Sequence, residues 1–132
     1  MSFEEYKAYP LQKKKAIARF CLEVAASDGK VDEDELNTIA AILYNAFELE
    51  ITSDLVEELM SDFDYMEVLK AFDEGELNTL GVILSLVAKA DGTFSFSEMD
   101  HIKELLIAGG MNVSYVSVLL EVLSQAQETD EE

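Results

Sequence analysis

The stretch Val24–Leu36 reads VAASDGKVDEDEL, and 63 positions later Val87–Met99 reads VAKADGTFSFSEM. In both stretches an Asp-Gly pair follows small and apolar residues and precedes a segment whose apolar residues have helical spacing. Gly is common where a helix ends and Asp favours turns, so each pair predicts a turn between two helices. We therefore expect two related helical units built around these turns.

The two stretches also match position by position. With an offset of 63, eight of sixteen aligned positions carry identical or similar residues: Val24/Val87, Ala25/Ala88, Asp28/Asp91, Gly29/Gly92, Val31/Phe94, Glu35/Glu98, Leu36/Met99 and Ile39/Ile102. A period of this size that occurs twice indicates an internal duplication, because solenoid arrays need about three or more repeats. We expect one domain over residues 1–132, with repeat units at about 11–60 and 74–125 that pack about a pseudo-twofold axis.

Each turn has a local explanation for its residues. Gly29 and Gly92 can adopt positive φ, which ends the preceding helix, and the Asp before each Gly can accept from a backbone N–H two residues on. The residues that follow have the spacing of a capping box, formed by an N-cap residue and the Glu three positions later. The two boxes are Asp32 with Glu35 and Ser95 with Glu98.

Helical periodicity continues along the rest of the chain. Thr52 or Ser53, and later Asp64, are suited to be helix N-caps, and Gly109-Gly110 predicts a helix end after Met99–Leu106. We also expect a short opening helix before Pro10. The other expected helices are Leu11–Ala26, Glu33–Glu48, one around Leu55–Met60, Glu76–Ala90 and about Ser114–Gln125. Glu76–Ala90 is apolar nearly all round, so we expect it in the middle of an all-α domain.

Composition also favours one helical domain. The 132 residues are 49% hydrophobic, and one Pro with six Gly are too few for disorder or for a turn-rich all-β fold. The net charge is −19, from 28 acidic and 9 basic side chains, so nucleic acids and anionic membranes are repelled. We expect cations or a basic patch on a protein partner instead.

Cysteine usage and the N-terminus indicate a cytoplasmic protein. Cys21 is the single cysteine and lies in an apolar stripe, which suits a small buried residue in a reducing compartment. The N-terminus carries acids where a signal peptide needs positive charge, and no apolar run reaches the ~18 residues of a membrane span. We expect no membrane insertion. The last helix can seal the core or supply a dimer face, so the oligomeric state stays open.

Four cations gather in the N-terminal half of the first long helix: Lys13, Lys14, Lys15 and Arg19. This placement is unfavourable, because the N-terminal end of a helix is the positive end of its dipole. Ion pairs with carboxylates elsewhere on this acidic chain explain the cluster, and a docking patch is the other interpretation. We favour the ion pairs.

The Asp-Gly turns also have the pattern of half a Ca²⁺ loop. Asp-Gly followed by an apolar residue and a Glu matches the second half of an EF-hand loop, but apolar residues or Lys89 occupy the first-half ligand positions. The candidate metal ligands are Asp28, Glu35, Asp91 and Glu98, brought together across the pseudo-twofold axis. Four converging carboxylates need a bound cation, and oxygen ligands suit Ca²⁺ or Mg²⁺ rather than Zn²⁺. Helix capping and metal binding are the two explanations for these residues, and we favour capping.

Two copies of the pattern A-x-x-D-G-x-apolar-x-x-x-E, here AASDGKVDEDE and AKADGTFSFSE, resemble the tellurite-resistance TerB-like family. The resemblance covers roughly Leu11 to Met111, and it is shared with the N-terminal region of membrane-anchored DnaJ-like co-chaperones. The chain lacks the His-Pro-Asp tripeptide of a J domain. The resemblance implies a compact bundle of about seven helices and an acidic motif that contacts divalent metal. Phe96 and Ser97 stand where acids could reinforce the second motif.

The residue types argue against an enzyme. His101 is the single His, Cys21 is expected to be buried, and no Gly-rich phosphate loop is present. We expect a non-enzymatic, acidic interaction module with protein partners, which the resemblance would place in a metal-, tellurite- or envelope-stress assembly. The alternative is a regulatory domain that binds Ca²⁺ or Mg²⁺ through the two Asp-Gly/Glu motifs.

Overall fold

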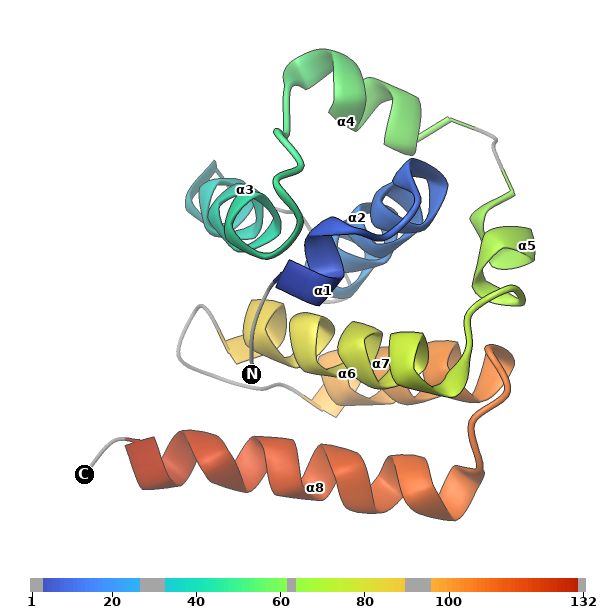
Figure 1. Cartoon of the computed structure of the whole chain (residues 1–132). Coiled ribbons are helices and arrows are strands. Elements are labelled where there is room, and N and C mark those ends of the chain that lie inside the picture. The colour runs from blue at the N-terminus through green and yellow to red at the C-terminus, as the bar shows by residue number, and fades with distance from the viewer. Residues whose placement is uncertain (1–3, 27–32, 62–63, 90–95, 131–132) are drawn as a thin grey trace.

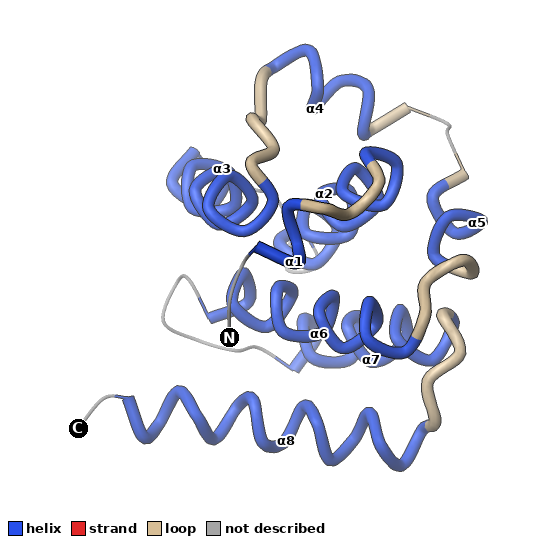
Figure 2. Tube along the Cα trace, viewed as in Figure 1, coloured by secondary structure: helices blue, strands red, loops and turns tan. Residues whose placement is uncertain are grey.

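The computed structural model describes residues 4–26, 33–61, 64–89 and 96–130, and within them the side chains of residues 6–122. These residues form helices and no strand (Figures 1 and 2). The helices are α1 (Glu4–Lys7), α2 (Leu11–Ala26), α3 (Glu33–Phe47), α4 (Ser53–Leu59), α5 (Tyr65–Leu69), α6 (Glu74–Lys89), α7 (Phe96–Ala108) and α8 (Val113–Asp130). The predicted all-α bundle of about seven helices is confirmed, with α1 as an additional single turn.

Several helix bounds follow from local hydrogen bonds. Thr52 caps α4 by accepting from the Leu55 N–H, and Asp64 caps α5 by accepting from the Glu67 N–H, as the sequence predicts. Helix α6 begins two residues before the predicted Glu76, because Asp73 is its N-cap. The Glu76 N–H donates to Asp73 Oδ1 and the Asp73 N–H donates to Glu76 Oε1, both at 2.8 Å. This reciprocal pair is a capping box that the sequence reading missed.

Helix α6 lies in the middle of the bundle, as its apolar sequence predicts (Figure 1). It packs against α2, α3, α7 and α8. The side chains that it buries include Leu77, Leu80, Ile83, Leu84, Val87 and Ala88. Helices α2 and α3 cover one side of α6 and α7, and α8 covers the other (Figure 1). Among the helices described, none is long and apolar enough to cross a membrane.

The short helix α1 is held by aromatic side chains. The Tyr6 ring stacks on Phe47 of α3, with 5.6 Å between the ring centroids, and the Tyr9 hydroxyl donates to Thr79 Oγ1 of α6 at 3.1 Å. Cys21 of α2 is fully buried, as expected, and burial raises the pKa of its thiol far above the usual range. The thiol therefore stays protonated and packs as a small apolar group.

The helix bounds have the same spacing as the repeated sequence. Helices α2 and α6 both have 16 residues, and they begin at residues 11 and 74. Helices α3 and α7 begin at residues 33 and 96. Each pair is thus 63 positions apart, which is what a duplication predicts. The two repeat units and their pseudo-twofold arrangement remain predictions.

Candidate functional site

The four predicted metal ligands divide between described and undescribed parts of the chain. Asp28 and Asp91 lie outside the described residues, so the convergence of all four carboxylates remains a prediction. Glu35 and Glu98 lie in the first turns of α3 and α7, both at the third helical position. Within the described residues, no three His, Cys, Asp or Glu side chains form a group that could hold a metal ion.

Glu35 and Glu98 have the helical position that a capping box requires. Glu35 is half-buried and Glu98 is only 4% exposed. The N-terminal end of a helix is the positive end of its dipole, so it stabilises a carboxylate in the first turn. The expected N-caps, Asp32 and Ser95, lie outside the described residues, and the boxes themselves therefore remain predictions.

The basic cluster on α2 is engaged in ion pairs, as the preferred interpretation predicts. Lys13 Nζ lies 2.8 Å from both carboxylate oxygens of Glu76, and Lys15 Nζ lies 3.1 Å from Glu58. Arg19 Nε lies 2.8 Å from Glu23. These contacts fix α2 to α6 and α4, and they neutralise most of the cluster from within the chain.

Arg19 also holds the end of α4 against α2. Its guanidinium donates to the backbone carbonyl of Leu59, and its Cζ lies 5.8 Å from the centroid of the Tyr65 ring. Burial raises the pKa of the Tyr65 hydroxyl, and the nearby Glu58 carboxylate raises it further. Because one guanidinium serves a carboxylate, a carbonyl and an aromatic ring, Arg19 is a structural residue rather than a free docking group.

His101 links the two halves of the chain, a contact that sequence reasoning missed. Its Nε2 lies 3.4 Å from Glu23 Oε1, so the Glu23 carboxylate stands between Arg19 of α2 and His101 of α7. The His101 side chain is 32% exposed and is therefore partly buried. No sequence pattern predicts this pair, because Glu23 and His101 are 78 positions apart in the chain.

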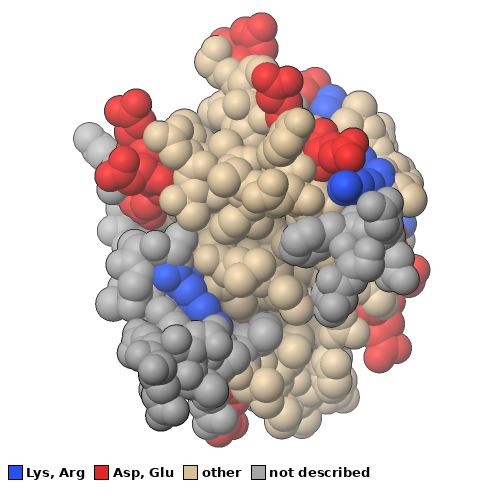
Figure 3. Space-filling model, turned by 60° about the vertical axis from the view of Figure 1, so that its left-hand side comes forward, with Lys and Arg blue, Asp and Glu red and all other residues tan. Residues whose placement is uncertain are grey.

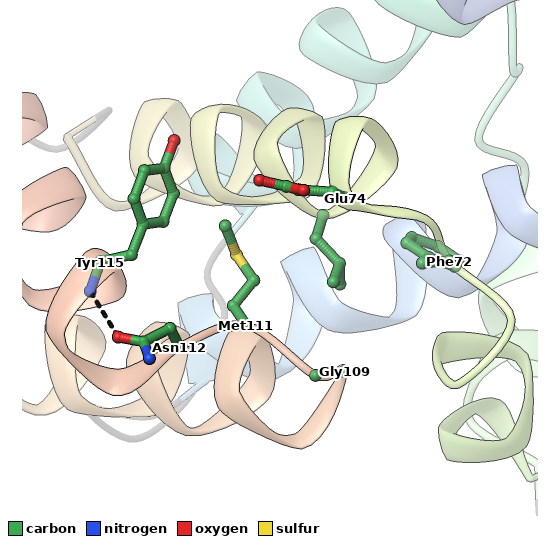
Figure 4. A pocket seen from close by; sticks show the side chains of 8 residues that line it. Phe72, Glu74, Gly109, Met111, Asn112 and Tyr115 are labelled. Carbon is green, nitrogen blue, oxygen red and sulfur yellow. Dashed lines mark hydrogen bonds between the residues drawn. The ribbon is translucent and has the colours of Figure 1, made fainter.

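A hollow of about 520 Å³ opens where α6 begins, α7 ends and α8 begins. Its lining comprises Phe72, Glu74, Leu77, Gly109, Gly110, Met111, Asn112 and Tyr115. Figure 4 shows the Glu74 carboxylate and the Tyr115 ring on either side of the space above Met111. Phe72, Leu77 and Met111 are 8% exposed or less, so they form an apolar floor, whereas Tyr115 is 45% exposed.

Tight turns shape the rim of this hollow. The Met111 N–H donates to the Leu106 carbonyl at 3.1 Å and the Gly110 N–H to the Ile107 carbonyl at 3.0 Å, which together form a Schellman motif. Gly110 occupies the left-handed position of that motif, with φ of 112°. The predicted helix end at Gly109-Gly110 is thereby confirmed.

Asn112 begins α8 on the other side of the turn. Its Oδ1 accepts from the Ser114 N–H at 2.9 Å. It also accepts from the Tyr115 N–H at 3.3 Å (Figure 4). The Tyr115 hydroxyl donates to Asn78 Oδ1 of α6 at 3.1 Å. The sequence signals of this site, Gly109-Gly110 and Asn112, indicate a turn. They do not reveal that α6 closes the hollow.

The surface of the molecule carries far more acidic than basic groups. In the view of Figure 3, acidic side chains gather at the top, at the upper left and on the right, with a few basic side chains on the left and right, around a central area without charge. The acids at the top lie over α4, which contributes Asp54, Glu57 and Glu58. Among the described cations, Lys7, Lys13, Lys15, Arg19 and Lys70 all lie within ion-pair distance of a Glu. The chain's own described cations therefore do not balance its excess of negative charge.

One protein family matches the sequence of the chain. The family model described as "Tellurite resistance protein TerB" matches residues 14–105, a range that runs from α2 into α7. No curated protein and no solved structure matches the chain significantly.

Proposed function

This chain belongs to the TerB family of tellurite-resistance proteins, and on that premise we propose that it is a non-enzymatic, acidic interaction module. It would act in a tellurite- or envelope-stress assembly, within a reducing compartment such as the cytoplasm. Its partner would be a protein with a basic surface.

The distribution of charge is the observation that carries this proposal. The chain has a net charge of −19, and most described cations are already paired with its own carboxylates. Asp54 and Glu57 on α4 are exposed, and no described residue forms an ion pair with either of them. Such a field speeds the association of a basic partner and repels acidic ones.

Affinity capture from cells grown with tellurite tests the proposal. Wild type is compared with a variant in which α4 is neutralised by Asp54→Asn and Glu57→Gln, and with the matched charge-conserving variant Asp54→Glu, Glu57→Asp. We expect a basic partner that wild type and the charge-conserving variant retain at low salt and release at high salt, and that the neutralised variant retains less well. Capture of no protein, or of partners that are indifferent to salt, would contradict the proposal.

We also propose a second candidate, the binding of Ca²⁺ or Mg²⁺ by Asp28, Glu35, Asp91 and Glu98. Support comes from Glu35 and Glu98, which occupy the same position in two helices that begin 63 residues apart. Each lies seven residues after the Asp of its Asp-Gly turn. Hard divalent cations prefer carboxylate oxygens, and a buried carboxylate such as Glu98 suits a site of this kind.

A further inference from the structure

We infer that the hollow between α6, α7 and α8 receives a basic side chain, lysine or arginine, from a partner protein. This inference rests on the proposed interaction role and gives that role a specific binding site.

The walls of the hollow match the two parts of a basic side chain. Leu77 and Met111 form the floor but are only 4% and 8% exposed, so an aliphatic stem meets a small apolar area there. The Glu74 carboxylate stands at the rim, facing the Tyr115 ring (Figure 4). A side chain that lies along the floor would therefore bring its charged end between a carboxylate and an aromatic ring.

Glu74 is available for such a contact. Its side chain is exposed, and within the described part of the chain no cation or hydrogen-bond donor pairs with it. The neighbouring acid Glu76 is different, because Lys13 and the Asp73 N–H already occupy its carboxylate. No Lys, Arg or His lines the hollow.

An anion would not be held here, although two helices begin at the rim. Asp73 Oδ1 accepts from the Glu76 N–H at the start of α6, and Asn112 Oδ1 accepts from two N–H groups at the start of α8. These bonds take three of the N–H donors that an anion at a helix N-terminus would use. Glu74 and the negative field of the molecule repel an anion further.

Tyr115 is the aromatic contact for the incoming cation. The nearly buried Phe72 ring already carries the Lys13 ammonium, which lies 5.7 Å from its centroid. Tyr115 is 45% exposed, and its hydroxyl bond to Asn78 fixes the ring at the edge of the hollow. A cation over an exposed tyrosine gains cation–π attraction that does not depend on the hydroxyl.

A side chain of a protein fits this site better than a metal ion. One carboxylate supplies too few oxygens for Ca²⁺ or Mg²⁺, which take six or more ligands. On α8, the helix that carries Tyr115, Val113 and Val118 are 53% and 60% exposed, so this helix offers apolar surface to residues next to the basic one. The occupant is therefore a basic residue within an otherwise apolar segment.

The test is an NMR titration of the full chain with an acetylated, amidated Gly-Leu-Lys-Leu-Gly peptide. The same peptide with norleucine in place of lysine keeps the aliphatic stem and removes the charge. We expect shifts of the Met111 methyl and Tyr115 ring signals with the lysine peptide and at least about threefold weaker binding of the norleucine peptide.

Variants locate the contact. Glu74→Gln should weaken binding of the lysine peptide about fivefold. Glu50→Gln removes an equal charge from the connection between α3 and α4, outside the lining of the hollow, and should change binding less than about 1.5-fold. Tyr115→Leu should weaken binding about threefold, whereas Tyr115→Phe keeps the ring but loses its bond to Asn78 and should weaken binding less.

The inference is overturned if Glu74→Gln and Glu50→Gln weaken binding equally, if norleucine binds as well as lysine, or if the peptide leaves Met111 and Tyr115 unshifted. Failure of the interaction role has a different signature. In that case the peptide titration succeeds, but no cellular partner shows salt-dependent binding. If such a partner exists and Glu74→Gln does not affect it, the interaction role stands and this binding site does not.

Discussion

Lys13 and Glu76 form an ion pair that joins the first turn of α2 to the first turn of α6, with 2.8 Å between Nζ and each carboxylate oxygen. The same Glu76 carboxylate accepts from the Asp73 N–H and completes the capping box of α6. Both side chains are mostly buried, at 21% and 12% exposure. The Glu76 carboxylate therefore both caps the start of the central helix and holds that helix against α2.

Removing this charge pair should destabilise the fold moderately. Glu76→Gln keeps an oxygen for the Asp73 N–H but loses the charge, so we expect a loss of about 1–2 kcal/mol in the free energy of unfolding. Glu76→Ala loses the capping bond as well and should cost about 1 kcal/mol more. Urea unfolding of both variants, with Lys13→Met and the double variant Lys13→Met/Glu76→Gln, measures the coupling. Additive effects of the two single changes would contradict a direct pair.

Gly109 should tolerate no side chain. An added Cβ would lie 2.5 Å from Leu77 Cδ2 and 3.2 Å from Leu69 Cδ1, so Gly109→Ala forces the floor of the hollow to move. We expect a loss of about 1–3 kcal/mol in thermal or urea unfolding. Gly75→Ala is the control, because its Cβ would meet Asp73 Oδ1 at an ordinary 3.5 Å. That change should be neutral or slightly stabilising, since Ala favours the helix.

Glu48 should be replaceable by glycine with a gain in stability. It follows the last residue of α3 with φ of 58°, a conformation that costs less for Gly than for other residues. Its ion pair with Lys7, at 3.2 Å and 62% exposure of Glu48, contributes little. We expect Glu48→Gly to raise the melting temperature, with a gain of up to about 1 kcal/mol. Glu50→Gly, two residues on, should not raise the melting temperature. Equal effects at both positions would contradict a role for the positive φ of Glu48.

Tyr9 should contribute a pH dependence at the alkaline end. Burial raises the pKa of its hydroxyl, an effect that the hydrogen bond with Thr79 partly opposes and the Glu76 charge reinforces. The folded state thus favours the protonated phenol, so its contribution is complete below the unfolded pKa of about 10 and is lost as pH rises through the folded pKa.

Unfolding in urea at about pH 9 and about pH 11 measures this effect. At the lower pH, wild type should exceed Tyr9→Phe by about 1 kcal/mol, and at the higher pH the difference should shrink. Tyr44→Phe, whose ring is 57% exposed, is the control and should follow wild type at both pH values. A constant difference between wild type and Tyr9→Phe would contradict the prediction.

The cation-binding candidate has a direct thermal test. Millimolar Ca²⁺ or Mg²⁺ should raise the melting temperature of wild type, because a ligand that binds only the folded state stabilises it. The double variant Asp28→Asn/Asp91→Asn should respond less. Asp34→Asn/Asp100→Asn removes two other charges from α3 and α7 and should still respond. If wild type and Asp28→Asn/Asp91→Asn both show no response, the divalent site is removed from consideration.

Features that depend on local chemistry could be read from the sequence. The N-caps Thr52 and Asp64, the helix end at Gly109-Gly110 and the bounds of α2 follow from residues next to one another in the chain. Asp73 was missed as a cap, because apolar periodicity alone placed the start of α6 at Glu76. The metal candidates stay predictions, since Asp28 and Asp91 lie outside the described residues.

Features that depend on tertiary packing could not be read in this way. The hollow is lined by residues 72–77 and 109–115, which come together only when α8 packs against α6. Glu74 looks like an ordinary acid of a helix N-terminus, and only its place opposite Tyr115 distinguishes it. The pair of Glu23 and His101 likewise joins α2 to α7 without any local signal.

The interaction role is tested most directly by the salt dependence of affinity for the captured partner, measured by calorimetry with purified proteins. We predict that the dissociation constant rises steeply with salt, and that the α4 variant Asp54→Asn/Glu57→Gln shows a smaller slope than wild type. An affinity that is the same at all salt concentrations, with equal slopes for both proteins, would contradict it.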